Sequence, residues 1–199
     1  MFEVNYYRLE NGAAPVEQFI DGLNPKMQAK AMYSLALLEE FGNQLREPFS
    51  KPIGDGIFEL RIKFSSDITR IFYFFVVDNK IILKRRLKRQ KRKSNWRKSI
   101  RKTMKGEIFM SDFRNHLARM LEKPEFQKEY ENGKAEYEVT RALVAARIEQ
   151  NLTQAQLAER SGVRQSNISR IENGTCSPTI ATLEQLATGM GKKLRIEFV

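Results

Sequence analysis

Hydrophobic residues follow strand spacing at several places in the first 83 residues. The segments 57–64 (IFELRIKF) and 68–77 (ITRIFYFFVV) are rich in aromatic and β-branched residues, which predicts two neighbouring strands. The second segment is apolar almost throughout, so we expect it at the centre of a sheet. Shorter strands are expected at 2–8 and at 81–83, the latter after an Asp-Asn turn.

Helical spacing of apolar residues separates the first strand from the later ones. Pro15 is well placed to open a short helix that runs to Leu23. Asn24-Pro25 starts a longer one that Gly42 ends, and a polar loop is expected over 43–56. The N-terminal region is therefore predicted to be an α+β domain with one strand, two helices and an antiparallel meander.

The pattern after residue 110 is helical. Ser111 can cap a first helix, Pro124 opens a short second one, and a long helix is expected around 135–150. Two short helices, a packing helix at 180–190 and an alternating terminal segment, LRIEFV, follow. This predicts an all-α domain with a short terminal strand.

The best-specified stretch lies between Thr153 and Gly174 (TQAQLAERSGVRQSNISRIENG). Thr153 can cap a helix, with Gln156 three residues later completing a capping box. Gly162 suits the left-handed corner of a tight turn between helices. Ile168 and Ile171 are three residues apart and predict an inward stripe on the second helix.

The opposite face of that second helix is polar. Gln165, Ser166, Ser169 and Arg170 share it. Outward amides, hydroxyls and a guanidinium suit a helix that reads base edges in the DNA major groove. The alternative is a helical hairpin whose polar face only meets solvent.

This stretch resembles the Cro/C1-type (XRE) helix-turn-helix family, from its Thr-Gln opening through Ile-Ser-Arg-Ile-Glu to Pro178 and the Leu183–Ala187 segment. The resemblance implies a phosphate contact by Gln154 and a pair between Arg147 and Glu172. Arg164 stands where many members have a capping Ser. The DNA-binding residues expected are Gln154, Arg164, Gln165, Ser166, Asn167, Ser169 and Arg170.

The N-terminal residues resemble RelE/HigB-type toxins, in particular their phage-derived branch. The similarity covers about residues 1–83 and rests on FEVNYYRLENGAAPVEQFIDGL, PKMQAKAMYSLALLEEFG, REPFSKPIGDGIFELRIKF and TRIFYFF. It implies a small α/β domain that cleaves mRNA, usually on the ribosome.

Cleavage of RNA by its own 2′-hydroxyl requires cations around the scissile phosphate. Arg61 and Lys63 lie two apart on one expected strand and so share a face. Arg70 on the next strand can face them, and Lys51 can approach from the loop. No histidine or adjacent carboxylate offers an obvious base. The alternative is that these side chains form the solvated face of a half-buried sheet.

The excess positive charge of the chain lies between the two regions. Residues 84–109 contain thirteen Lys and Arg and one acid, a net +12, against 22 basic and 23 acidic residues elsewhere. The segment is a linker, a nucleic-acid tether through phosphate contacts, or the product of a frameshift. The third hypothesis arises because NWRKSIR (95–101) is compatible with a neighbouring-frame translation of an acidic amphipathic helix, which the toxin family has at this place.

Residues 110–199 resemble a HigA-type antitoxin, with the helix-turn-helix at about 138–190. We therefore expect a fused toxin–antitoxin polypeptide whose C-terminal domain binds operator DNA as an autorepressor, as a homodimer. The toxin-like domain is expected to be truncated and impaired. The alternative is an active, ribosome-dependent mRNA endonuclease neutralised by its own antitoxin domain, with mRNA and the ribosome as partners.

Other classes of site have little support. A single cysteine, Cys176, and a single histidine, His116, argue against disulfides and structural zinc, and we expect a loop thiol and a surface histidine. No metal or cofactor is expected. No apolar run is long enough to span a bilayer, and the N-terminus begins as a strand instead of a signal peptide, so a cytoplasmic protein without membrane contact is expected.

Overall fold

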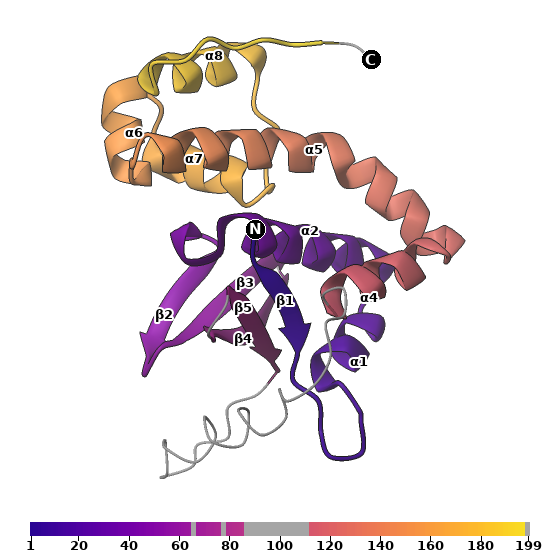
Figure 1. Ribbon diagram of the computed structural model, residues 1–199. Coiled ribbons are helices and arrows are strands. Elements are labelled where there is room, and N and C mark those ends of the chain that lie inside the picture. Colours follow the sequence, from indigo (N-terminus) through magenta and orange to yellow (C-terminus); the bar gives the residue numbers. More distant parts are fainter. Residues whose placement is uncertain (65–66, 77–78, 86–111, 198–199) are drawn as a thin grey trace. The chain divides into compact units, whose positions relative to one another are not determined.

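The computed structural model describes residues 1–64, 67–76, 79–85 and 112–197 (Figure 1). The chain forms two compact units, one of Met1–Ile62 and Ile68–Glu131, the other of Lys63–Asp67 and Asn132–Val199. The first unit holds a five-stranded sheet, and the second is helical. The predicted fold class, α+β followed by an all-α domain, is confirmed. The expected linker at 84–109 lies almost wholly outside the described residues.

A five-stranded sheet, in the order β1-β5-β4-β3-β2, forms the first unit. The parallel pairing of β1 with β5 brings the first strand of the chain beside the last one of the sheet. Antiparallel pairs join β4 to β5 and β2 to β3. The strands are β1 (Glu3–Tyr6), β2 (Ser50–Gly54), β3 (Ile57–Phe64), β4 (Asp67–Phe75) and β5 (Lys80–Lys84).

Strand β2 lies where the sequence predicted a polar loop. Its residues from Lys51 onward are exposed, and Pro52 lies among them, so the strand has no hydrophobic alternation to reveal it. An edge strand tolerates a proline because one of its sides needs no hydrogen-bonding partner. The loop prediction for 50–54 was therefore wrong, and Lys51 lies on a strand.

Helices α1 (Pro15–Asp21) and α2 (Pro25–Phe41) begin at the prolines expected. The Asn24 side chain caps α2 by accepting a hydrogen bond from the Met27 N–H. At its end, Gly42 has φ 50°, and an added Cβ would lie 1.9 Å from the Phe2 ring. Glycine is therefore required there for space as well as for conformation.

Helix α4 (Asp112–Leu121) packs against β1 and α2 within the first unit (Figure 1). Phe113 and Met120 are buried on its inner face. The Asp112 carboxylate accepts a hydrogen bond from the Tyr6 N–H at 3.0 Å and pairs with Arg8 at 2.8 Å. The edge of β1 is thus covered by a segment that follows the basic region in sequence.

His116 of α4 is buried, so the expectation of a surface histidine was wrong. Its Nδ1 lies 2.8 Å from the Tyr6 hydroxyl, and its Nε2 lies 3.0 Å from the Asp21 carboxylate. Next to it, Arg119 pairs with Glu17 of α1. The compact unit extends to Glu131, whereas the sequence placed a boundary at residue 110.

The second unit contains most of α5 together with α6 (Gln154–Ser161), α7 (Gln165–Glu172) and α8 (Ile180–Gly189). Helix α5 runs unbroken over Pro124–Glu149, so the two separate helices predicted there are one. The shared core consists of Leu143, Leu152, Leu157, Val163, Ile168, Ile171, Leu186 and Met190. Cys176 packs against this core as a free thiol.

The expected terminal strand is not formed over residues 194–197, the described part of LRIEFV. A strand requires a hydrogen-bonded neighbour, and the described residues from Asn132 onward form only helices and connections. Leu194 and Ile196 stay exposed as a result. None of the described helices has the length and apolar character needed to cross a membrane.

Candidate nucleic-acid interfaces

The turn between α6 and α7 has the geometry that its residues predicted. The Thr153 hydroxyl accepts a hydrogen bond from the Gln156 N–H, and the Gln156 side chain accepts one from the Thr153 N–H, which completes the capping box. Gly162 adopts the left-handed conformation with φ 72°. Val163 is buried directly after it. These contacts fix the direction in which α7 leaves the turn.

Helix α7 buries one face and exposes the other. Ile168 and Ile171 are 0% and 3% exposed and belong to the core of the unit. The predicted DNA-reading side chains are exposed or half-buried: Arg164, Gln165, Ser166, Asn167, Ser169 and Arg170. Arg164 occupies the N-cap and makes no side-chain capping bond, as expected where a serine is replaced. The polar row is therefore held on a short helix anchored from behind.

The predicted pair of Arg147 and Glu172 is present and buried. Arg147 donates to both Glu172 carboxylate oxygens, at 2.7 and 3.2 Å, and to the Leu152 carbonyl at 3.0 Å. Their side chains are 4% and 0% exposed. Because the end of α7 is tied to α5 through this pair, the orientation of α7 does not depend on packing alone.

Gln154 also belongs to this network. Its amide donates to Glu172 at 2.7 Å, and its oxygen accepts from the Gln165 amide at 3.2 Å. In the free protein Gln154 thus links the buried carboxylate to the first residue of α7. The family resemblance had predicted only a phosphate contact for Gln154.

A second polar cluster lies on the sheet. The Glu59 carboxylate of β3 is 2.7 Å from Arg61 Nε and 3.4 Å from Arg70 Nε on β4. Arg61 and Arg70 keep 34% and 51% of their side-chain surface exposed, whereas Glu59 keeps 12%. Two predicted cations are therefore brought together, with a carboxylate between them. The expectation that no carboxylate lies near them was wrong.

The other two predicted cations, Lys51 and Lys63, lie on β2 and β3. Lys51 of β2 is the register partner of Glu59, and cross-strand partners point to the same face. Lys51 is 49% exposed and lies 4.0 Å from Glu47. Lys63 is half-buried two residues beyond Arg61. Glu59 was missed although the spacing Glu59-x-Arg61-x-Lys63 places all three on one face of a strand.

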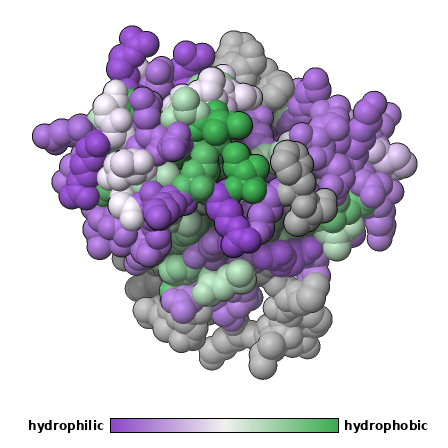
Figure 2. All heavy atoms as spheres, turned by 90° about the horizontal axis from the view of Figure 1, so that it is seen from above, coloured by the Kyte–Doolittle hydropathy of each residue, from purple (hydrophilic) through white to green (hydrophobic). Residues whose placement is uncertain are grey.

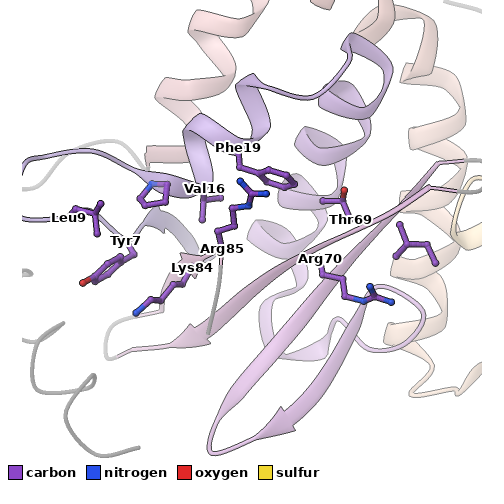
Figure 3. Close-up of a pocket in the computed structure, with 10 residues that line it drawn as sticks. Tyr7, Leu9, Val16, Phe19, Thr69, Arg70, Lys84 and Arg85 are labelled. Atoms are coloured by element: carbon purple, nitrogen blue, oxygen red, sulfur yellow. The ribbon is translucent and has the colours of Figure 1, made fainter. Parts of the chain in front are cut away.

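A pocket of about 710 Å³ opens beside this cluster and includes Arg70 (Figure 3). The start of α1, the start of β4 and the end of β5 contribute its walls. Its lining residues are Tyr7, Leu9, Pro15, Val16, Phe19, Ile68, Thr69, Arg70, Lys84 and Arg85. No local signal in the sequence could have joined these positions, because they come from separate elements.

Cations lie on both aromatic rings of the pocket. Lys84 Nζ is 4.5 Å from the centre of the Tyr7 ring, and the Arg85 guanidinium carbon is 3.7 Å from that of Phe19. Figure 3 shows these two side chains extending toward their rings. Burial lowers the pKa of the Lys84 ammonium. An anion bound next to Lys84 would therefore meet a partly desolvated positive charge.

Comparisons with known families match two separate regions of the chain. Residues 18–106 match the family described as "Phage derived protein Gp49-like", and residues 143–196 match the family described as "Helix-turn-helix". The first match continues through most of the basic segment, where we expected the resemblance to end. A search of curated proteins found no match. The chain thus joins a region similar to this phage-derived, Gp49-like family to a helix-turn-helix domain of the DNA-binding kind.

Proposed function

We propose that the protein is a DNA-binding autorepressor of a fused toxin–antitoxin type, with a HigA-like C-terminal part and a HigB-like N-terminal part. The observation that carries this is the exposed row on α7, backed by two buried isoleucines and a buried ion pair. Helix-turn-helix proteins insert such a helix into the major groove. Gln165, Ser166 and Arg170 read bases, and Arg164 meets the backbone.

Binding to DNA from upstream of the protein's own gene tests this proposal. Combined Gln165→Ala and Arg170→Ala replacements should weaken specific binding by about 10-fold or more, because each base contact contributes about 1–3 kcal/mol. Lys193→Ala, which removes a positive charge elsewhere in the same unit, is the control. An unchanged affinity of the double variant for its site would reject the repressor. Equal weakening on all sequences would instead favour binding through the basic segment.

A homodimer is part of the proposal. Leu194 and Ile196 alternate with charged residues in an extended segment without a strand partner among the described residues. Hydrophobic side chains also gather at the surface on the side where α8 and this segment lie (Figure 2). The same segment of a second copy can pair with it and place two α7 helices on a palindromic operator. Sedimentation should give twice the monomer mass, and Ile196→Asp should return the monomer.

A second candidate function, RNA cleavage, is favoured by Glu59 and the cations around it. The Glu59 carboxylate accepts the proton of a 2′-hydroxyl, whose oxygen then attacks the adjacent phosphorus. Arg61, Arg70 and Lys51 stabilise the charge that develops on the phosphoryl oxygens. The 5′-oxygen leaves with a proton from water, which gives a 2′,3′-cyclic phosphate. The partners of this reaction are mRNA and the ribosome, and a cytoplasmic location suits both functions.

The cleavage test uses a fragment of residues 1–131, because α4 contributes buried side chains to the first unit. If the domain is active and held in check by the rest of the chain, this fragment should cut mRNA on ribosomes and Glu59→Gln should abolish cutting. The full chain should then be inactive. An impaired toxin domain, as expected from the altered basic segment, gives no cutting by either form.

The origin of the basic segment has its own test. Reading codons 80–112 of the gene in the neighbouring frames shows whether an acidic helix is encoded there. Stop codons across codons 84–109 in the shifted frame would exclude the frameshift hypothesis.

A further inference from the structure

We propose that the pocket between α1 and the ends of β4 and β5 binds one unstacked nucleotide of single-stranded RNA. The proposal rests on the proposed ribonuclease function and adds a substrate subsite to it. The pocket, about 710 Å³ in volume, falls within the range of about 300–1,000 Å³ typical of small-molecule sites. A single base with its ribose fits this space, whereas the stacked bases of a duplex do not enter a concave site.

The aromatic walls supply stacking surfaces. Tyr7 follows β1 and Phe19 lies on α1, and both line the pocket. Aromatic side chains bind unstacked bases of any sequence because every base has a π-face. The Arg85 guanidinium already lies 3.7 Å from the Phe19 ring centre. Arginine planes also stack on bases, so Arg85 and an aromatic ring can hold a base between them.

The cations supply the phosphate contacts. Lys84 and Arg70 line the same pocket, on β5 and β4. Thr69 adds a hydroxyl at the wall formed by β4 (Figure 3). Cations next to aromatic rings are the combination that single-strand binding sites use.

Arg70 connects the pocket to the candidate cleavage cluster. It lines the pocket and also lies 3.4 Å from Glu59. An RNA strand with one base in the pocket therefore has a neighbouring phosphate beside the Arg70 guanidinium. The pocket would hold the strand in register for attack at that phosphate.

The first experiment measures binding of a fluorescently labelled hexauridylate to the full chain. Tyr7→Leu and Phe19→Leu each remove a ring while keeping an apolar side chain, and each should raise Kd about 5-fold or more. Tyr137→Leu, which removes a ring from α5 outside the pocket, should leave Kd unchanged. Equal Kd values for all four proteins would overturn the proposal. Thermal melting by circular dichroism checks that each variant is folded.

The second experiment separates the pocket from the general charge of the chain. Lys84→Ala should make the slope of log K against log salt less negative by about 0.7, the value for one phosphate contact on a single strand. Lys80→Ala removes the same charge from the same strand outside the pocket and should leave the slope unchanged. Identical slopes for the two variants would contradict a phosphate contact at Lys84. Because the basic segment is the same in both proteins, it contributes equally to both slopes and does not affect their difference.

The third experiment does not depend on any variant. Hexauridylate carrying 5-iodouridine, cross-linked by light to the full chain, should label the peptides that hold Tyr7 or Phe19. Labelling confined to other peptides would overturn the proposal. Pocket labelling of the full chain, together with no mRNA cutting on ribosomes by the 1–131 fragment, would leave the subsite standing and reject the ribonuclease. Cutting by the fragment that persists when it carries Tyr7→Leu or Phe19→Leu, together with an unchanged Kd of the same variants of the full chain, would reject the subsite alone.

Discussion

The charge pair of the helix-turn-helix domain and the charge cluster of the sheet differ in their access to water. Arg147 and Glu172 are 4% and 0% exposed, and both carboxylate oxygens accept hydrogen bonds from the arginine. Arg61 and Arg70 reach the same kind of carboxylate, Glu59, but stay 34% and 51% exposed. The buried pair fixes a helix in place, whereas the exposed arginines keep donors available for an anionic ligand.

The two regions also differ in how their candidate sites are assembled. The α6–α7 interface is built from about twenty consecutive residues, and Arg147 and the core residues Leu143, Leu186 and Met190 anchor it from outside this stretch. The sheet cluster and its neighbouring pocket combine α1 with β2, β3, β4 and β5. A contiguous site can be weakened at one position without unfolding the rest, whereas a dispersed site depends on the whole unit.

The largest effect is expected from opening the buried ion pair. Arg147→Ala leaves Glu172 as an uncompensated buried charge and should lower the free energy of unfolding of the second unit by about 3–5 kcal/mol. Urea denaturation followed by circular dichroism measures it. Glu138→Gln, which breaks the exposed pair with Arg141, is the control and should cost less than about 0.5 kcal/mol. Equal losses of unfolding free energy in the two variants would contradict the expected difference between buried and exposed ion pairs.

Truncation in α4 tests whether the first unit reaches Glu131. Met120 is 1% exposed, so Met120→Ala should destabilise this unit by about 2–4 kcal/mol. Hydrogen exchange should show faster exchange in β1 and α1, which neighbour α4. If exchange rises only in the helices after residue 132, α4 does not belong to the first unit.

Alkaline pH should lower the stability of the first unit. Burial raises the pKa of Tyr73 to about 12, and the hydrogen bond with Ser50 only partly offsets this. Because the folded pKa lies above the unfolded value of about 10, the stabilisation is complete below pH 10 and is lost as the pH rises to 12. The loss amounts to at most about 3 kcal/mol. Unfolding titrations at pH 9 and 11.5 measure it, and Tyr73→Phe should show a smaller pH dependence.

The smallest effect is expected at the start of α6. Thr153→Ala removes the capping box and should cost about 1 kcal/mol. Thr175→Ala, which removes a hydroxyl that donates to the Arg170 carbonyl in the last turn of α7, is a comparison at a helix C-terminus. A shift in the urea midpoint of the second unit measures both. If Thr153→Ala left the urea midpoint unchanged, the capping box would not contribute to the anchoring of α7.

The sequence by itself determined the elements whose signals are local. Thr153, Gly162 and the two isoleucines specified the turn and the inward stripe of α7, because capping and helical spacing act within a few residues. The pair of Arg147 and Glu172 was found only through a family resemblance. Strand β3 was predicted from its alternation, and with it the shared face of Arg61 and Lys63.

Tertiary structure alone decided which distant residues meet. Strand β2 lacked any hydrophobic alternation, so only its pairing with β3 made it a strand and placed Lys51 opposite Glu59. The burial of His116 depended on Tyr6 and Asp21, about a hundred residues earlier in the chain. The terminal segment kept its alternation and still formed no strand over residues 194–197, because the described residues from Asn132 onward offer no neighbouring strand. Pairing and burial depend on partners distant in sequence, and a local pattern carries no information about them.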